Sequence, residues 1–542
     1  MVPLRWASSL KLFCCWWLLP VVVEAGGGVR LEFGEARRVV SFASLSAVAI
    51  DTCALKMGLD LGNEQFIALT KALGPGILRV GGTDQKKYVY DMEEPPTFVV
   101  NGERRRRREG VQKQRLSLFR QEQACECGST CVLTRAYFES LLDFCEATGR
   151  RLVFGLASEG AYAVSNASAL MEVAGERVFA YTFGNEQDTD AMDQRRKLDQ
   201  LQEMFPTAKF AAPDTNVGPI HDFSTPDLSS DPKVGDRLAY LEKYAKLNAD
   251  RLVAVTWHTY DFRAEAINAT DKGSLNWPPD DANFTRFFDP SYLALFDQAY
   301  DMVARVTPPD LPLWLDEFNS VCHHGVYNLT DSFANSLWLA HRFGSAALKD
   351  RLQLAARQTL IGYQYALLND TTLKPNPDYF TTLLARRLIG EDDVVTVDVK
   401  AAKADNDKDD DEGTTTTTTL APFAFCSPRA LILLVVSLDE TATFDIDDLP
   451  LPRKDFVMTP RWNDDDDDDS CGARCALTSS DIELNGHTLD ESDIGDIDTK
   501  YALDASSTTL HLPPLTFAFS VVDLDSSSSS LSACSSIARR FL

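Results

Sequence analysis

The sequence contains neither an excess of positive charge nor, after its start, a long apolar segment. Its 542 residues include 53 Lys and Arg against 80 Asp and Glu, a formal net charge of −27. This charge argues against generic binding to nucleic acids or to anionic membranes. Beyond the first 25 residues no run is long and apolar enough to cross a bilayer. We therefore expect no nucleic-acid partner and no integral membrane association, and we expect a monomer.

Common patterns for a metal or a nucleotide cofactor are also missing. Cys125, Cys127 and Cys131 are close in sequence, but their spacing matches no common zinc pattern and no histidine lies nearby. A metal site is the alternative interpretation of this cluster, and disulfides are the one we favour. No Gly-rich phosphate-binding turn follows the first apolar run. We expect no cofactor and no metal.

The N-terminus has the pattern of an export signal. Arg5 and Lys11 precede the apolar stretch Leu12–Val23, and small residues follow at Val23-Glu24-Ala25. A signal anchor is the alternative, but so short a stretch would span a bilayer poorly. We predict a signal peptide over residues 1–25 and a secreted or lysosomal (vacuolar) protein.

Export makes disulfides and N-glycosylation possible. Of the 12 cysteines, removal of Cys14 and Cys15 with the signal leaves ten, an even number. Five N-x-S/T sequons fit a glycoprotein, and they are Asn166, Asn268, Asn283, Asn328 and Asn369.

Several segments have a strongly biased composition. The acidic blocks Asp405–Glu412 and Asp464–Asp469 are typical of solvated loops. The runs Thr414–Thr419 and Ser526–Ser530 are of low complexity. The one strongly basic run, Arg104–Arg108, fits an exposed loop, with a polyanion grip or a processing site as alternatives.

Residues 26–385 predict an α/β fold. Short apolar runs alternate there with helix-length amphipathic stretches, which is typical of a parallel sheet covered by helices. Eight such units predict a closed (β/α)8 TIM barrel, with a doubly wound sheet as the alternative. The runs are 41–51, 76–82, 151–157, 177–185, 209–214, 251–258, 312–317 and 360–368.

Residues 386–542 predict a smaller antiparallel β-sandwich. Alternating apolar patterns separated by polar loops are typical of short strands. Residues 29–40 could add one or two strands to this domain before the chain enters the barrel. The expected strands are 430–438, 442–449, 455–460, 481–489 and 515–524.

The tetrapeptide GNEQ occurs twice, with Glu64 in the first copy and Glu186 in the second. Barrel enzymes carry their active residues at the C-terminal ends of strands. Glu186 directly follows the fourth apolar run and has that position. Asn63 instead resembles a helix N-cap, and helical periodicity follows it. We predict a chemical role for Glu186 and an exposed helix start for Glu64.

A second carboxylate ends the seventh run, at Glu317 in the sequence PLWLDEF. Glycosidic bonds are usually cleaved by two carboxyl groups, one protonated and one ionised. Glu317 follows Glu186 by 131 residues, three strands further around the barrel. Asp316 is a rival candidate, but strand alternation should turn it to the opposite side.

At this point the chain resembles a known family. FGNE after the fourth strand and WLDE at the seventh look like the acid and nucleophile motifs of retaining barrel glycosidases. More specifically, the chain is similar to heparanase and related β-glucuronidases, glycoside hydrolase family 79. The matching motifs occur in the same order, and they are ILRVGGTD (77–84), RLVFGL (151–156), APD (212–214), VTWHTYD (255–261), LTDSFANSLWLAHRFG (329–344), Arg357-Gln358 and PDYF (377–380).

This resemblance implies roles for individual residues. Glu186 would be the general acid/base and Glu317 the nucleophile, while Asn185 would bind the sugar 2-hydroxyl. His258 and Tyr260, on alternate positions of the sixth strand, would face the cleft and orient Glu317.

The resemblance also implies a substrate and a disulfide. Tyr365 on the eighth strand and Gln358 before it would help hold a uronate, so that the partner would be a glucuronic-acid-containing glycan. Cys426 and Cys534 match the disulfide of the family's sandwich domain.

One segment departs from the family pattern. Members that cut heparan sulfate follow the nucleophile with a Tyr-Gly-Gly stretch that grips the sugar carboxylate, and here residues 321–325 read VCHHG. Basic strips for sulfated chains are also hard to find. The sequence therefore supports β-glucuronide chemistry better than heparan sulfate as the substrate. A non-catalytic glycan-binding relative and a barrel glycosidase for a non-uronate sugar are the alternatives.

Overall fold

The computed structural model describes residues 28–93, 99–100, 103–104, 125–159, 162–186, 190–218, 226–263, 282–403, 419–427, 429–461 and 476–524. The predictions for the signal peptide, Asn268, both acidic blocks, the serine run and Cys534 fall outside these residues. The same holds for Arg105–Arg108 and for Thr414–Thr418. Among the described helices none is both long and apolar enough to span a membrane.

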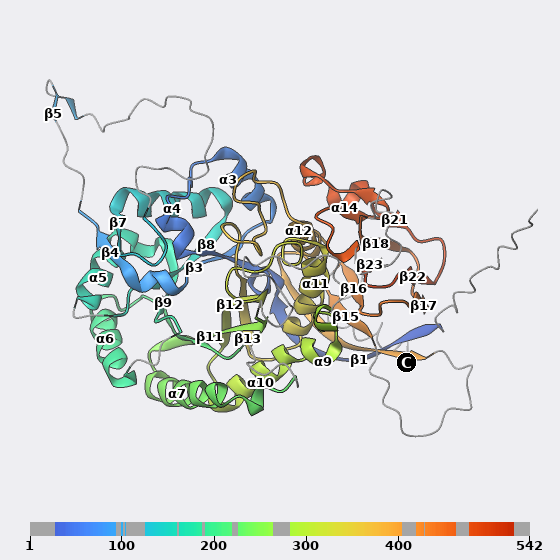
Figure 1. Ribbon diagram of the computed structural model, residues 1–542, viewed down its shortest axis with the longest axis horizontal. Helices are drawn as coiled ribbons and strands as arrows, with labels where there is room; N and C mark the ends of the chain where they lie inside the picture. Colours follow the sequence, from blue (N-terminus) through green and yellow to red (C-terminus); the bar gives the residue numbers. More distant parts are fainter. Residues whose placement is uncertain are drawn as a thin grey trace, which may run out of the picture.

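Eight parallel strands close into a barrel, as predicted (Figure 1). The last strand pairs with the first, through Ala356 opposite Ala47 and Arg357 opposite Val48. Most strand residues are buried because helices cover the outside of the barrel and side chains fill its inside. The strands are β2 (Ala47–Asp51), β3 (Gly76–Gly81), β8 (Arg150–Leu156), β9 (Val178–Phe183), β10 (Phe210–Asn216), β11 (Leu252–Phe262), β12 (Leu313–Val321) and β13 (Leu352–Arg357).

Long helices connect successive strands, and several begin at side chains that cap them. Thr134 accepts a hydrogen bond from a backbone N–H of the first turn of α4, and Asp190 and Asp231 do the same for α6 and α7. The helices are α3 (Glu64–Ala72), α4 (Arg135–Thr148), α5 (Ala163–Ala174), α6 (Ala191–Met204), α7 (Pro232–Asn248), α10 (Leu295–Val306), α11 (Phe333–Ala347) and α12 (Pro377–Ile389). Shorter helices are α1 (Phe42–Leu45), α2 (Thr52–Lys56), α8 (Ala282–Thr285), α9 (Pro290–Leu293) and α14 (Ile497–Lys500).

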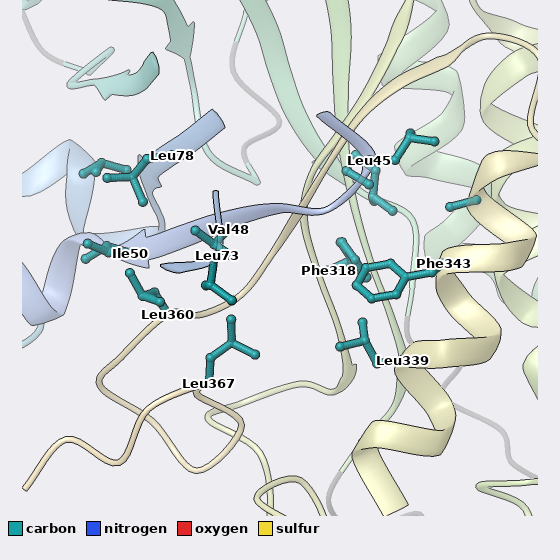
Figure 2. Packing of buried hydrophobic residues seen from close by; sticks show 14 of the residues in the cluster. Leu45, Val48, Ile50, Leu73, Leu78, Phe318, Leu339, Phe343, Leu360 and Leu367 are labelled. Carbon is teal, nitrogen blue, oxygen red and sulfur yellow. The ribbon is translucent and has the colours of Figure 1, made fainter. Parts of the chain in front are cut away.

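The predicted eighth strand is wrong. The strand is Leu352–Arg357, and residues 360–368 form a loop over the end of the barrel. This loop is apolar because it closes the core. Leu360 and Leu367 are buried in the same hydrophobic cluster as Val48 and Leu73 (Figure 2). Its apolar composition therefore comes from burial and not from a place in the sheet.

Two disulfides fix the connection between β3 and β8. Cys53 pairs with Cys127, and Cys125 pairs with Cys131. The Cys125–Cys131 cluster thus forms disulfides, as expected. Cys131 begins β7 (Cys131–Thr134), which pairs in parallel with β4 (Tyr88–Asp91). The same connection contains the two-residue strands β5 (Val99–Val100) and β6 (Glu103–Arg104).

At the end of the barrel away from the loop 360–368, a buried arginine donates hydrogen bonds to backbone carbonyl groups. Arg386 near the end of α12 is buried and donates to the carbonyl oxygens of Ala43 and Pro75 and to Ser46 Oγ. Cations are favoured near helix C-termini, where carbonyl groups lack helical partners. Arg386 therefore has a structural role, and the negative charge of Glu391 lies nearby.

The predicted antiparallel domain is present, at the orange and red end of the chain in Figure 1. Its strands form one sheet in the order β20-β19-β18-β23-β16-β15-β14-β1-β17-β22, with β21 beside β18. The strands are β1 (Val29–Ser41), β14 (Asp393–Lys403), β15 (Leu420–Cys426), β16 (Ala430–Ser437), β17 (Phe444–Asp447), β18 (Arg453–Pro460), β19 (Ile482–Leu484), β20 (His487–Thr488), β21 (Leu503–Asp504), β22 (Leu510–Leu512) and β23 (Phe517–Asp523).

The first strand belongs to this sheet, as residues 29–40 suggested. β1 pairs with β14 in antiparallel fashion from Val29 opposite Lys403 to Ser41 opposite Asp393. It also pairs in parallel with β17 through Val29 and Ile446. The expected strand 481–489 is a hairpin that turns at Asn485-Gly486, both with positive φ, the usual chemistry of a tight hairpin turn.

The sheet buries both of its faces. The side chains of one face, among them Phe425 and Phe519, join the main core of the barrel. The side chains of the other face, among them Leu31 and Leu433, form a second hydrophobic cluster. Helix α11 approaches β15 closely at Gly344, where a Cβ atom would lie 2.2 Å from the ring of Phe423. The absence of a side chain at Gly344 therefore lets the barrel and the sheet share one core.

Candidate active site

Glu186 and Glu317 come together although 131 residues separate them. Glu186 follows the end of β9 by three residues, and Glu317 lies within β12. One carboxylate oxygen of each, together with one ring nitrogen of His258, lie within 4.8 Å of one another. Glu317 is buried, whereas the Glu186 side chain keeps 31% of its surface exposed. The fourth and seventh strands of the barrel thus bring two carboxylates close together.

The first GNEQ copy has the predicted structural role. Asn63 Oδ1 accepts a hydrogen bond from Phe66 N at 2.9 Å and so caps α3, whose first residue is Glu64. Glu64 is exposed. The same four letters therefore give a capped helix in one place and a strand-end turn in the other.

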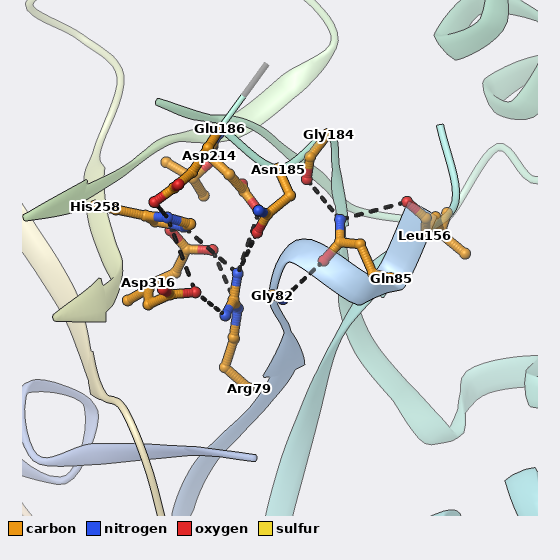
Figure 3. Close-up of polar contacts among 12 residues, drawn as sticks. Arg79, Gly82, Gln85, Leu156, Gly184, Asn185, Glu186, Asp214, His258 and Asp316 are labelled. Atoms are coloured by element: carbon orange, nitrogen blue, oxygen red, sulfur yellow. Dashed lines mark hydrogen bonds and ion pairs between the residues drawn. The ribbon is translucent and has the colours of Figure 1, made fainter. Parts of the chain in front are cut away.

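Gln85 holds the turn that carries Glu186. Its Nε2 donates to Gly184 O at 2.6 Å, and its Oε1 accepts from Gly82 N at 3.2 Å (Figure 3). Glu186 has a φ of 50°, and its backbone N–H donates to Asp214 O at 2.9 Å. A positive φ is uncommon outside glycine and is retained where surrounding contacts enforce it. These contacts fix the position of Glu186 in the cleft.

Arg79 lies fully buried at the centre of the site, on β3 (Figure 3). Its Nη1 donates to Glu317 Oε2 at 2.7 Å, and its Nη2 lies 3.5 Å from both Asn185 Oδ1 and Asp214 Oδ2. Its Nε lies 3.6 Å from Asp316 Oδ2. One guanidinium therefore binds carboxylates from β10 and β12 together.

Glu317 is held in its ionised form. Burial alone would raise its pKa, but the positive charges of His258 and Arg79, with hydrogen bonds from Tyr260 and Arg79, lower the pKa below its usual value. Tyr260 Oη donates to Glu317 Oε1 at 2.7 Å. Tyr260 therefore contacts Glu317 directly from the neighbouring strand.

His258 contacts the other carboxylate more closely. Its Nδ1 lies 3.0 Å from Glu186 Oε1 and 3.9 Å from Glu317 Oε2. Burial would lower the pKa of His258, but Glu317, Asp316 and Glu186 raise it well above its usual value. Asn216 Nδ2 also donates to Glu186 Oε1, at 2.9 Å. His258 therefore bridges the two carboxylates as well as orienting one.

The prediction for Asp316 is wrong. Strand alternation was expected to turn it away, yet its carboxylate is buried against Arg79 and His258 Nε2, the latter at 3.4 Å. The pairing of β11 with β12 shifts register between Trp257 and His258. Such a shift breaks the strict alternation of side chains, so that Asp316 and Glu317 both reach Arg79.

Two further buried carboxyl groups border the site. Asp214 at the end of β10 accepts from Thr256 Oγ1 at 2.5 Å, and burial with the nearby Asp316 raises its pKa to about 7. Asp51 at the end of β2 accepts from Gln358 Nε2 at 2.7 Å, and burial with the nearby Glu317 raises its pKa to about 7.

Gln358 and Tyr365 lie beside Asp51, but not on the predicted strand. Strand β13 ends at Arg357, so Gln358 directly follows it and Tyr365 lies in the loop beyond. The ring of Tyr365 stacks on that of Tyr260, with centroids 6.5 Å apart. The two residues thus reach the site from a loop that closes it.

These side chains line a cleft of about 490 Å³. Its wall carries the acidic groups Asp51, Asp84, Glu186 and Glu317 and the basic groups Lys87, Arg237 and Arg263. The segment that departs from the family pattern lies here as well: His323 and His324 line the cleft with φ values of 58° and 79°. His324 stacks on Tyr363, with ring centroids 4.2 Å apart. Aromatic and basic side chains therefore border the acidic centre.

The carboxylates and His258 are also close enough together to bind a cation. Glu186, His258 and Glu317 form one such group, and Asp214, His258 and Asp316 form another. Arg79, however, already places a fixed positive charge against three of these carboxylates. The donor set therefore suits an internal charge balance better than a resident metal ion.

Sequence reasoning did not single out Arg79, Asp214 and Asp51. Each could have been noticed in the sequence, because a charged residue inside or at the end of an apolar run must be paired when it is buried. Arg79 stands in the middle of GILRVGG, and Asp51 and Asp214 end their runs. Their partners could not be read from the sequence, since they lie on different strands.

Comparison with known proteins supports the resemblance. The chain is 24% identical over 509 residues to a hyaluronoglucuronidase of Hirudo nipponia, covering 86% of this chain and 90% of that protein. It is 25% identical over 353 residues to heparanase-like protein 3 of Arabidopsis thaliana, covering 63% of this chain and 60% of that protein. A baicalin-β-D-glucuronidase of Scutellaria baicalensis is 25% identical over 240 residues, 43% of this chain and 40% of that protein. No family model matches the chain.

Solved structures show the same architecture. A GH51 arabinofuranosidase from Xanthomonas axonopodis pv. citri superposes with a TM-score of 0.59 at 12% identity, covering 92% of this chain and 100% of that chain. A 4-O-α-L-rhamnosyl-β-D-glucuronidase from Fusarium oxysporum 12S superposes equally well, at 13% identity and with the same coverage. By sequence the chain is similar to heparanase-like glucuronidases, and its fold is the barrel seen in these solved glycoside hydrolases.

Proposed function

We propose that this protein is a retaining glycoside hydrolase that cleaves β-glucuronide linkages in a polysaccharide or proteoglycan glycan. The observation that carries the proposal is the pair Glu186 and Glu317, of which one carboxylate oxygen each lies within 4.8 Å of the other in one cleft. Retaining enzymes separate their two carboxyl groups by about 5–5.5 Å, and inverting enzymes by about 6.5–9.5 Å to admit a water. The short separation favours a double displacement.

The environments of the two carboxylates divide the roles. Glu317, ionised and held by Arg79 and Tyr260, attacks the anomeric carbon and forms a covalent glycosyl–enzyme ester. Glu186, more exposed, donates its proton to the departing oxygen and later removes a proton from the attacking water. Asn185 binds the sugar 2-hydroxyl, whose hydrogen bond strengthens in the transition state.

The sugar is proposed from the relatives and from the cleft. The relatives named above are a hyaluronoglucuronidase, a heparanase-like protein and a baicalin-β-D-glucuronidase, and we infer a glucuronide as the shared feature. Gln358 and Tyr365 hold the uronate on the side of Glu317. We also propose that the protein is secreted or vacuolar (lysosomal), which agrees with the disulfides Cys53–Cys127 and Cys125–Cys131 of the described part of the chain.

Two other functions compete with this one. A non-catalytic glycan-binding relative would keep the cleft but would have no need of an ionised Glu317 beside a second carboxylate. A glycosidase for a non-uronate sugar is favoured by the altered segment Cys322–Gly325, where histidines stand at the wall of the cleft.

A panel of aryl β-glycosides that includes the glucuronide tests the proposal. Glu186→Gln should lower turnover by about 10²–10⁴-fold with ordinary leaving groups, since the proton donor is lost. An activated leaving group should partly restore this variant. Glu317→Gln should abolish turnover with every substrate.

The second GNEQ copy provides a matched control. Glu64→Gln makes the same change in the same tetrapeptide, at an exposed helix start, and should leave turnover unchanged. Wild-type rates in Glu317→Gln would show that the nucleophile assignment is wrong. No turnover of any aryl glycoside, with glycan binding retained, would favour the binding protein.

The stereochemistry is tested separately by an NMR time course of hydrolysis. The first product should be the β-anomer, because two displacements restore the configuration. Appearance of the α-anomer first would contradict the double displacement even if glucuronide hydrolysis itself were confirmed.

A further inference from the structure

The fully buried His258 lies between two sets of carboxylates. On one side its Nδ1 faces Glu186 at 3.0 Å and Glu317 at 3.9 Å. On the other side its Nε2 faces Asp316 Oδ1 at 3.4 Å. Both ring nitrogens therefore point at negatively charged groups.

Asp316 is fully buried. Among the described residues its carboxylate forms ion pairs with Arg79 and His258, without a geometrically ideal hydrogen bond to either, and it also lies near the Asp214 carboxyl group. Burying an ionised carboxylate is costly unless opposite charges compensate for it. The Asp316 carboxylate is therefore compensated by these two groups together.

The carboxylates around Arg79 outnumber its single positive charge. Arg79 contacts Glu317, Asp316 and Asp214, three carboxylates for one guanidinium. Asp214 takes up a proton most readily, since its pKa is raised to about 7 by burial and by Asp316. Two negative charges then remain, and His258 supplies the second positive charge.

We propose that Asp316 is a positioning residue that keeps His258 doubly protonated, as a cation whose Nδ1–H is directed at Glu186. The inference rests on the proposed function, in which Glu186 exchanges a proton twice in each cycle. After Glu186 has given its proton to the leaving group, it is an anion. The His258 cation then stabilises that anion until the attacking water returns a proton.

One group opposes this arrangement. Arg79 Nη2 lies 3.4 Å from His258 Nε2, and like charges repel. This geometry would also suit a neutral His258 whose bare Nε2 accepts a hydrogen bond from Arg79. The two states differ in a single proton on Nε2, which nitrogen NMR distinguishes directly.

The first experiment is ¹⁵N NMR of the full-length protein labelled at its seven histidines, with His258→Gln to assign the signal. We expect both nitrogens of His258 to be protonated at pH 6 and to remain so at pH 7.5. An unprotonated Nε2 at pH 6 would overturn the proposal. This readout requires no turnover, so a failure of the proposed glycosidase activity would not affect it.

The second experiment replaces Asp316 by Asn. Loss of an opposite charge within about 4–6 Å typically changes a pKa by about 1–3 units, so the His258 titration should move down by about that amount. The alkaline limb of kcat/KM should move down with it, because the protonated form is the one required. A His258 titration identical to that of the wild type would refute the role of Asp316.

Asp261→Asn provides the matched control. Asp261 is also a buried carboxylate of the barrel, but it accepts hydrogen bonds from Trp338 Nε1 at 2.7 Å and from Arg342 Nη2 at 2.5 Å. Its loss should lower stability without moving the pH profile. An equal shift in both variants would show a general effect of removing buried charge. If Asp316→Asn does not fold, the wild-type spectrum still tests the doubly protonated state of His258, and an unprotonated Nε2 there overturns the proposal.

Discussion

Replacing Arg79 by Met tests the charge balance beneath the cleft. The guanidinium is fully buried, 2.7 Å from Glu317, 3.5 Å from Asp214 and 3.6 Å from Asp316. Removing one partner of a buried ion pair typically costs about 3–5 kcal/mol. We expect the free energy of unfolding to fall by about that amount at pH 7.5.

The loss should be smaller at pH 5. Without Arg79, the neighbouring carboxyl groups are disfavoured as anions, and their folded-state pKa values rise above the unfolded value of about 4. A raised carboxyl pKa stabilises the fold at low pH, and this contribution is lost as the pH rises through the folded-state pKa. A group raised to about 7, the value that Asp214 already has, recovers about 2.7 kcal/mol between pH 7 and 5, at about 1.36 kcal/mol per unit.

Denaturant unfolding of both proteins at pH 7.5 and pH 5 measures this difference. Arg386→Met is the control, since Arg386 is buried as well but donates to carbonyl oxygens and to Ser46. That variant should show a smaller difference between the two pH values, since its hydrogen bonds go to neutral oxygens and Glu391 acts on it through its charge. If Arg79→Met loses the same free energy at both, the carboxylates do not depend on Arg79 for their charge, and the reasoning fails.

Three further predictions follow from the site and the sequence. Tyr260→Phe removes a charge-assisted hydrogen bond to Glu317, usually about 1.5–3 kcal/mol, so kcat/KM should fall by about 10–150-fold at unchanged stereochemistry; an unchanged value would show that Arg79 alone orients the nucleophile. Non-reducing peptide mapping should find Cys426 linked to Cys534, and free thiols at both would contradict this pairing. Turnover of desulfated glucuronate polymers should exceed that of sulfated ones and vary little with salt. If the sulfated polymer is cleaved faster, and this advantage is lost when Arg104–Arg108 are changed to Ser, the inferred preference for weakly sulfated substrates is wrong.

The barrel could be predicted because its strands are continuous apolar runs between helices. Seven of the eight runs coincide with strands, but the eighth strand, Leu352–Arg357, is only modestly apolar. Residues 360–368 are richer in apolar side chains because they cover the end of the core. Hydrophobicity reports burial, and it cannot separate a buried strand from a buried loop.

The two carboxylates could be found because each stands at a strand end. The charge network around them could not, because it depends on which strands become neighbours and on a register shift opposite Asp316. Alternation predicted the opposite orientation for that residue. Arg79 carried a signal in its own run, but its partners on β10 and β12 are set only when the barrel closes.

The pairing of β1 with β14 has a consequence for biosynthesis. Val29 emerges from the ribosome 364 residues before Asp393, where its neighbour strand β14 begins. At usual elongation rates of about 5–20 residues per second, synthesis of these residues takes about 20–70 s. During that interval the apolar side chains of Val29, Leu31 and Phe33 have no sheet to join. An unpaired apolar strand is a site for association with other chains. The nascent protein therefore has a period in which chaperone binding to its first strand would protect it, and this period ends only when the whole barrel has been made.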